Sequence, residues 1–411
     1  MIDLKAARAD PDRYRAALAR KGAAEAFDEL LAADERWRAL VPRVDELRAR
    51  TKLRGKPSPE QLEELRGVKE ELQQVEASLA GAERDRDRLA LRVPNLPADD
   101  VPDGATEDDV RELRRVGEPP ELADPKEHLE LGRFDMDRAA RMSGARFGYW
   151  IGDTARLALA LYRYALDRLA AQGFVTVLPP VLVRAEALVG TGAFPTDEQN
   201  VYELAGDDLF LAGTAEIPLA GLHAGEIIDR DELPLRYVAF SPCFRREAGA
   251  AGRDTRGMIR VHQFNKVEQF ALTLPEASWD EHERLLANTE ELVRDLGLPY
   301  RVVVLPAGDM SAASAKTYDV EIWFPSQGRY RETASISNTT DFQARRLGIR
   351  YRDGKALEPV HTLNGTAVVD RMALAILENF QDGDGSVTVP GPLVALGAPR
   401  RIGGEPASTG D

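Results

Sequence analysis

The sequence predicts an α+β protein, with a large domain built on an antiparallel sheet flanked by helices and an antiparallel coiled-coil arm before it. Three observations lead to this prediction. Apolar residues repeat with helical spacing near the N-terminus, an amphipathic helix follows in the middle, and several short apolar runs separated by turns come after it. We expect an N-terminal domain over residues 1–98, with its arm at about residues 25–93, and a second domain over 99–411.

The arm is predicted from two apolar seams. In each half, apolar residues recur at alternating steps of three and four, which keeps them on one side of a helix. The seams are Leu30, Ala33, Trp37, Leu40, Val44 and Leu47, and then Leu65, Val68, Leu72, Val75, Leu79 and Ala82. Gly55, Pro57 and Pro59 are expected in the turn. Pro42 lacks a backbone N–H and should kink the first helix, at a cost of about 3 kcal/mol.

Residues 92–104 are rich in proline and acidic residues and indicate a linker. An amphipathic helix closed by Gly173 is predicted over residues 156–173. Strands are predicted at 174–183, 236–245, 258–270, 301–307 and 319–324. Because turns rather than regular helices separate most of them, the sheet should be largely antiparallel. Residues 404–411 are expected to form a disordered tail.

Composition excludes several classes of protein. The 411 residues carry a formal net charge of -15, which disfavours non-specific coating of nucleic acid. Cys243 is the single cysteine, so a disulfide framework and a multi-cysteine zinc site are excluded. No apolar run approaches the roughly 18 residues of a membrane span, and the N-terminus does not resemble a secretory signal. We therefore expect a cytoplasmic protein without a membrane partner.

Positive charge is concentrated in residues 244–270 of this acidic chain. If residues 258–270 form a strand, alternation places charge and one ring on one face and apolar residues on the other. The polar face would hold Arg260, His262, Phe264, Lys266 and Glu268, and the apolar face Ile259, Val261 and Val267. Arg245 and Glu247 share a face of the preceding strand, and a glycine-rich loop with Arg253 and Arg256 joins the two.

Such a hairpin has the chemistry of a nucleotide-triphosphate site. Guanidinium groups suit phosphates, a ring suits a base, and carboxylates suit amino groups. The alternative is a solvated sheet face with cross-strand ion pairs. A phenylalanine at the centre of the face and an arginine loop beside it favour the nucleotide site.

These residues resemble a known family. The segment CFRREAG…GRDTRGMIRVHQFNKVE closely resembles motif 2 of the seryl-tRNA synthetases, a family of class II aminoacyl-tRNA synthetases. The resemblance covers nearly the whole chain. It includes VPNLPADDVP, GTGAFP, GTAEIPL, GDM…AKTYDVEIWFP, RETASISNTTDFQARR and HTLNGTAVVDR…LAILENFQ.

The resemblance implies a homodimer that activates L-serine with ATP and magnesium to seryl-adenylate and then transfers serine to the 3′ end of tRNA(Ser), with tRNA(Sec) as a further candidate substrate. It also implies a class II catalytic domain over 99–411. Two alternatives stay open. One is a divergent paralogue that serves antibiotic biosynthesis or resistance, and the other is an inactive RNA-binding relative.

Site residues also follow from the resemblance. It implies catalytic roles for Arg245, Glu268 and Arg371. The ATP-binding set is Arg245, Arg246, Glu247, Arg260, Val261, Phe264, Glu332, Thr333, Ala334, Ser335 and Arg371. The serine-binding set is Thr214, Ala215, Glu216, Arg245, Glu268 and Thr366. Glu332 and Ser335 would hold magnesium with ATP, which suits the preference of that ion for hard oxygen ligands.

Two segments depart from the family's pattern. The segment TAVVDR is one residue shorter than the usual family pattern and places Asp370 directly before Arg371. An adjacent carboxylate is expected to reduce the effective charge of that arginine. GTAE lacks the more usual proline before Thr214.

The arm carries a second basic stretch. By resemblance it binds the long variable arm of serine tRNA across the homodimer, reading the shape of the RNA. The implied contacts are Arg36, Arg43, Arg48, Arg50, Lys52 and Arg54. A positive stripe on a projecting hairpin is also typical of phosphate-backbone binding. The alternative is a solvated coiled-coil face.

Overall fold

The computed structural model describes residues 1–52, 58–248 and 257–403. The chain divides into two compact units, Met1–Leu96 and Pro97–Asp411, close to the boundary predicted between residues 98 and 99. Several predictions lie outside the described residues. They concern the turn residues Gly55 and Pro57, the loop arginines Arg253 and Arg256, and the tail 404–411.

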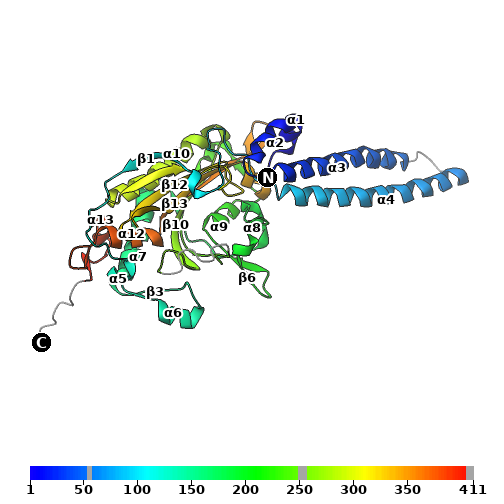
Figure 1. The fold of residues 1–411 in the computed structure, drawn as a ribbon. Coiled ribbons are helices and arrows are strands. Elements are labelled where there is room, and N and C mark those ends of the chain that lie inside the picture. The colour runs from blue at the N-terminus through cyan, green and yellow to red at the C-terminus, as the bar shows by residue number, and fades with distance from the viewer. Residues whose placement is uncertain (53–57, 249–256, 404–411) are drawn as a thin grey trace. The chain divides into compact units, whose positions relative to one another are not determined.

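The N-terminal unit is helical. Its helices are α1 (Leu4–Ala9), α2 (Pro11–Ala19), α3 (Ala24–Arg50) and α4 (Pro59–Ala90). Figure 1 shows α3 and α4 lying alongside each other as a hairpin, which we call the arm. Ser58 caps α4 through a reciprocal pair of hydrogen bonds with Gln61. Pro59 is therefore the first residue of α4 rather than part of the turn, where its missing N–H costs nothing.

Both predicted seams face the inside of the hairpin. Leu30, Ala33, Val44, Leu47 and Val68 are buried, and the other seam residues are half-buried. The helix α3 runs without a break through Pro42. Pro42 is exposed, so its ring faces solvent on the side away from the seam.

The second unit contains an eight-stranded sheet in the order β1-β11-β12-β13-β16-β10-β9-β4. All neighbouring strands are antiparallel except β4 and β9, which confirms the predicted sheet type. The strands are β1 (Arg111–Val116), β4 (Val175–Val177), β9 (Leu235–Phe244), β10 (Gln263–Thr273), β11 (Tyr300–Val304), β12 (Lys316–Phe324), β13 (Arg329–Thr340) and β16 (His361–Val369).

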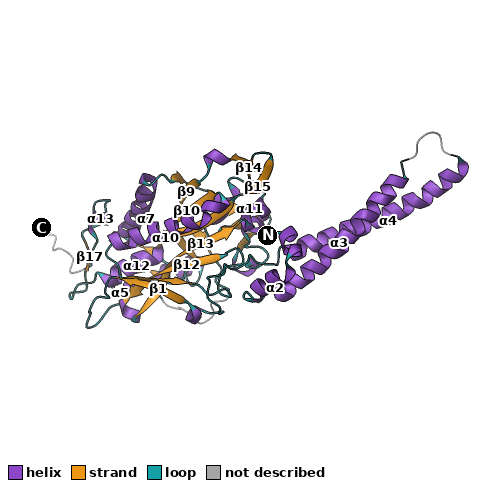
Figure 2. Ribbon diagram, turned by 90° about the horizontal axis from the view of Figure 1, so that it is seen from above, coloured by secondary structure: helices purple, strands orange, loops and turns teal. Residues whose placement is uncertain are grey.

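Three helices, α7 (Asp153–Ala171), α10 (Ser278–Asp295) and α12 (Asp370–Asn379), pack against this sheet and close the largest hydrophobic core (Figure 2). The other helices are α5 (His128–Leu131), α6 (Met136–Ser143), α8 (Ala185–Thr191), α9 (Glu216–Gly221), α11 (Phe342–Leu347) and α13 (Gly391–Val394). In the described parts of the chain, no helix has the length and apolar character to cross a membrane.

Four small sheets complete the described part of this unit. They are β2 (Phe134–Asp135) with β3 (Tyr149–Trp150), β5 (Leu182–Val183) and β6 (Tyr202–Leu204) on either side of β7 (Leu209–Leu211), β14 (Arg350–Asp353) between β8 (Ile227–Asp229) and β15 (Ala356–Pro359), and β17 (Val387–Thr388) with β18 (Arg401–Ile402). The predicted strand at 174–183 is in fact β4 and β5, which belong to different sheets. Pro179 and Pro180 lie between them and have no N–H to donate to a ladder.

The charged hairpin is shorter than predicted. The strand β9 ends at Phe244 and β10 begins at Gln263, so Arg245, Glu247 and residues 258–262 are not in strands. The last pairing is a hydrogen bond of 3.0 Å from Arg245 N–H to the His262 carbonyl. Beyond it the backbone leaves the extended region, because Glu247 has φ 52° and Gly257 has φ 78°.

Candidate active site

A cavity of about 310 Å³ lies over the strands β10, β13 and β16. It brings together most of the residues predicted to bind ATP and serine. Those that line it are Thr214, Glu216, Arg245, Glu247, Arg260, Val261, Phe264, Glu268, Glu332, Thr333, Ser335, Thr366 and Arg371. Predicted site residues as far apart in the sequence as Thr214 and Arg371 thus line one cavity, as expected if they act together.

Alternation along β10 explains how the sheet separates site from core. Lys266 and Glu268 face the cavity, whereas Gln269 points to α10. The Gln269 amide donates to the Leu285 carbonyl at 3.2 Å and to the Thr289 hydroxyl at 3.1 Å. Because helices cover one face and the cavity lies on the other, both faces of β10 are buried. The predicted alternation of polar and apolar faces is therefore correct within β10 itself.

Arginines form one wall of the cavity. The Arg245 guanidinium lies 5.3 Å from the centre of the Phe264 ring, and its Nε donates to the Gly213 carbonyl at 3.2 Å. The Arg260 Nη1 donates to the Glu247 carboxylate at 2.6 Å. This wall offers cations, a ring and a carboxylate to a ligand.

A buried polar pocket lies at the other end of the cavity. It is formed by Lys266 and Glu268, which are buried, and by Thr214 and Glu216, which are half-buried. The Lys266 ammonium donates to the Thr214 hydroxyl at 2.8 Å and forms an ion pair with Glu268. Burial, followed by the nearby Glu268 charge, raises the pKa of Glu216 to about 7. Burial also raises the pKa of Glu268, while Lys266 opposes that shift. The pocket holds two carboxylates whose ionisation is sensitive to a cationic ligand.

Three residues of this pocket were missing from the predicted sets. Lys266 was assigned only to the polar face, and Asn364 and Gln343 were not singled out. The Glu216 Oε1 accepts from the Gln343 amide at 2.7 Å and from the Asn364 amide at 2.9 Å. Asn364 is two residues before Thr366 in β16, so strand alternation applied there would have identified it. Gln343 lies in α11 and had no such signal.

Glu332, Ser335 and Asp319 form an acidic corner of the site. The Ser335 hydroxyl donates to Asp319 at 2.6 Å and lies 3.4 Å from Glu332 Oε1. Burial, followed by the Glu332 charge, raises the pKa of Asp319 well above its usual value. Glu332 and Ser335 therefore present hard oxygen atoms at one point, which suits magnesium shared with a nucleotide. Among the described residues, no group of three or more His, Cys, Asp or Glu is placed to hold a metal by itself.

Asp370 and Arg371 have separate partners. The Asp370 carboxylate accepts from the Asn265 N–H at 3.0 Å and from the Tyr162 hydroxyl, and burial raises its pKa to about 6. The Arg371 guanidinium donates to the Ile259 carbonyl at 3.2 Å and to the Glu332 carbonyl. These contacts do not support the expectation that Asp370 offsets the charge of Arg371, because the carboxylate is engaged by β10 and α7.

Three predicted site residues do not line the cavity. Ala215 and Ala334 are buried in the packing beneath it. Arg246 lines a separate hollow of about 520 Å³ with Phe194 and Phe210. The roles assigned to these residues remain predictions.

The arm presents its basic residues differently. Arg43 pairs with Glu71 of α4, the Arg48 Nε donates to Glu76 at 2.9 Å, and Arg50 lies 3.5 Å from Glu64. Arg36 and Lys52 are exposed, and Arg54 lies outside the described residues. The basic stripe thus includes ion pairs across the hairpin.

Comparison with known proteins agrees with the fold and the cavity. Residues 200–380 match the family model described as tRNA synthetase class II core domain (G, H, P, S and T), which makes the larger unit a class II aminoacyl-tRNA synthetase core. Residues 1–97 match the Seryl-tRNA synthetase N-terminal domain. The serine–tRNA ligase of Thermobifida fusca is 47% identical over 409 residues, covering 96% of each chain. The chain belongs to the seryl-tRNA synthetase family.

Solved structures give the same result. The crystal structure of seryl-tRNA synthetase from Pyrococcus horikoshii complexed with ATP has a TM-score of 0.92 and 40% identity, covering 98% of this chain and 99% of that one. The cytoplasmic serine–tRNA ligase from Naegleria fowleri in complex with AMP has a TM-score of 0.88 and 32% identity, covering 97% and 96%. None of these matches favours the specialised paralogue or the inactive relative.

Proposed function

We propose that the cavity joins L-serine to ATP to form seryl-adenylate, and that the enzyme then transfers serine to the 3′ end of tRNA(Ser). One observation carries this proposal. Arg245, Phe264 and Glu268 face a single cavity together with Glu332 and Arg371, although they come from distant parts of the chain. The reaction needs cationic groups of this kind, because the serine carboxylate must attack the α-phosphate and both are anions.

Charge neutralisation and alignment are the main tasks in this step. We assign Arg245 to both the α-phosphate and the serine carboxylate, and Arg260 and Arg371 to the outer phosphates. Phe264 stacks on the adenine, with Arg371 over its other face, and Glu247 accepts from the adenine amino group. The Arg260–Glu247 ion pair must then open or share its carboxylate with the base. Guanidinium forks suit these phosphate oxygens.

Serine is recognised by the buried polar pocket. We assign the ammonium to Glu216 and Glu268 with Thr214, and the hydroxyl to Glu268 and Thr366. A substrate without a hydroxyl would leave buried polar groups unpaired, which discriminates strongly against alanine and glycine. Lys266 holds Glu268 and Thr214 in place for these contacts.

Glu332 and Ser335 would hold magnesium together with ATP. The ion would neutralise phosphate charge as pyrophosphate leaves. The chain's own contribution is to hold the two oxygen ligands close together. The Arg371 contact to the Glu332 carbonyl keeps this part of β13 beside the phosphate-binding arginine.

The arm is the proposed tRNA-binding element, with tRNA(Sec) as a further candidate substrate. Its contacts are Arg36, Arg43, Arg48, Arg50, Lys52 and Arg54. Exposed ion pairs are screened by solvent and contribute little to stability, so tRNA phosphates can replace the glutamate partners at little cost.

We further propose a cytoplasmic homodimer that places this arm against tRNA held by the partner's active site. Leu159 of α7, Val175 of β4 and the neighbouring Leu178 are all more than half exposed. Large apolar side chains clustered on neighbouring segments are typical of an interface. A second copy of the chain would cover them.

Serine-dependent ATP–pyrophosphate exchange, measured beside tRNA charging, tests the function. Exchange together with charging is the expected result. Exchange without charging would instead indicate a ligase that loads another carrier, and the absence of both would indicate an inactive relative.

A further inference from the structure

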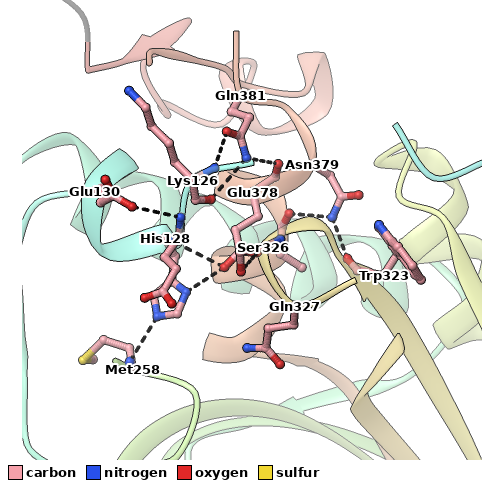
Figure 3. A network of polar contacts seen from close by, with 12 residues as sticks. Lys126, His128, Glu130, Met258, Trp323, Ser326, Gln327, Glu378, Asn379 and Gln381 are labelled. Carbon is pink, nitrogen blue, oxygen red and sulfur yellow. Dashed lines mark hydrogen bonds and ion pairs between the residues drawn. The ribbon is translucent and has the colours of Figure 1, made fainter. Parts of the chain in front are cut away.

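His128 and Glu378 form a buried pair outside the set of residues that line the cavity. His128 begins α5, Glu378 lies in the last turn of α12, and neither is more than 2% exposed. Figure 3 shows both side chains within a network of polar contacts. Burying an imidazole and a carboxylate is costly unless each finds partners, so these partners reveal what the pair does.

Glu378 is held entirely as an acceptor. Its Oε1 accepts from the His128 backbone N–H at 3.2 Å and contacts His128 Nδ1 at 2.8 Å. Its Oε2 accepts from the Ser326 backbone N–H at 3.2 Å and from the Ser326 hydroxyl at 2.7 Å. Because the carboxylate faces only donors here, Nδ1 of His128 carries the proton.

The tautomer decides what the other ring nitrogen can do. A neutral imidazole with a proton on Nδ1 has a lone pair on Nε2. The Met258 backbone N–H donates to this Nε2 at 3.2 Å, as the assignment requires. Gly257 permits the close approach, since a Cβ at that position would lie 2.8 Å from Nε2. The ring thus connects Glu378 to the backbone of a distant segment.

That segment lines the nucleotide end of the cavity. Met258, Ile259, Arg260 and Val261 all line it, although they belong to no strand. Arg371 donates to the Ile259 carbonyl from the start of α12. Arg371 and Glu378 are seven residues apart and therefore lie on one side of that helix. The helix α12 thus holds this irregular segment at two points, directly through Arg371 and indirectly through His128.

We propose that His128 is a positioning residue for ATP: Glu378 sets its tautomer so that Nε2 holds the Met258 N–H and with it the backbone of residues 258–261. The inference rests on the proposed function, in that it takes this cavity as the ATP site. His128 itself does not line the cavity. Its effect should therefore appear in ATP binding and leave serine binding unchanged.

Two amide substitutions at one position separate positioning from packing. His128→Asn keeps an amide donor near the place of Nδ1 but has no acceptor that reaches Met258. His128→Gln extends an amide oxygen to the place of Nε2. In serine-dependent pyrophosphate exchange, the asparagine variant should raise the KM for ATP about five- to thirty-fold, the effect of one lost hydrogen bond to a buried donor. The glutamine variant should stay within about three-fold of the wild type, and the KM for serine should change little in both.

Thermal unfolding of the two variants is the matched control, because both lose the ring. Equal KM values for ATP in the two variants, or a KM that follows the loss in melting temperature, would overturn the proposal.

A measurement on the unmodified protein covers the case in which these buried variants do not fold. The chain has five histidines, so ¹⁵N-imidazole NMR can assign each ring. His128 should carry its proton on Nδ1 with Nε2 unprotonated. A proton on Nε2 would refute the inference whatever the variants do. Absence of exchange in the wild type would instead refute the proposed function, so the two failures are distinguishable.

Discussion

In the arm, basic side chains such as Arg48 lie on the surface and pair across two helices, whereas Lys266 and Glu268 in the cavity of the larger unit form a buried pair. Arg48 and Glu76 of the arm are each at least 40% exposed, and their pairing is screened by solvent. Lys266 and Glu268 are at most 8% exposed and depend on each other. The charged surface of the arm can therefore exchange its ion-pair partners for a ligand, whereas the polar pocket of the cavity has a fixed geometry before a ligand binds.

Removal of the arm should have the largest effect, and it tests whether tRNA binding and serine activation depend on different parts of the chain. Deleting about residues 30–90 should eliminate tRNA charging and leave serine-dependent pyrophosphate exchange intact, because the cavity uses no arm residue. Both activities would be measured on the same preparation. Equal charging by the shortened protein would show that the arm is not the tRNA-binding element.

Within the cavity, Glu332→Ala should lower pyrophosphate exchange by about 10²–10³-fold, the typical cost of losing one preorganised electrostatic contact. Glu332 is exposed on its strand, so the free energy of unfolding should change little. Glu321→Ala, which removes a neighbouring carboxylate outside the cavity lining, is the control. Near-normal exchange in the Glu332 variant would remove that residue from the mechanism.

The pH dependence of serine binding probes the buried carboxylates. Burial raises the pKa of Glu216 to about 7, so its neutral form dominates below that pH and cannot pair with the serine ammonium. The KM for serine should therefore rise as pH falls, by about tenfold per unit below 7. Glu216→Gln should flatten this dependence while raising the KM at neutral pH. A flat profile in the wild type would contradict the assignment of the ammonium to Glu216.

Single arm residues should have the smallest effects. Arg36→Ala should raise the KM for tRNA a few-fold and reduce the slope of log KM against log salt by about 1, because one phosphate contact is lost. Arg66→Ala, which removes an exposed arginine of α4 outside the predicted set, should change neither quantity. Equal effects of the two variants would reduce the arm to a non-specific positive surface.

The arm was the easier region to predict. The positions of Leu30, Ala33 and Val44 on one side of α3 are set by their spacing along the sequence, and the seam repeats that signal. The strand predictions were less accurate at their ends. Residues 258–262 alternate like a strand, yet Gly257 has a positive φ and His128 and Arg371 hold this segment from elsewhere in the fold.

The sequence by itself determined the helical arm, the largely antiparallel sheet, the family and most residues of the cavity, because spacing and long motifs are local properties of a chain. Only the tertiary structure decided which polar side chains contact one another. Gln343 reaches Glu216 across 127 positions and Glu378 reaches His128 across 250. Burial, pKa shifts and the tautomer of an imidazole arise from such encounters, since they depend on the dielectric surroundings and on partners that only folding brings within hydrogen-bond distance.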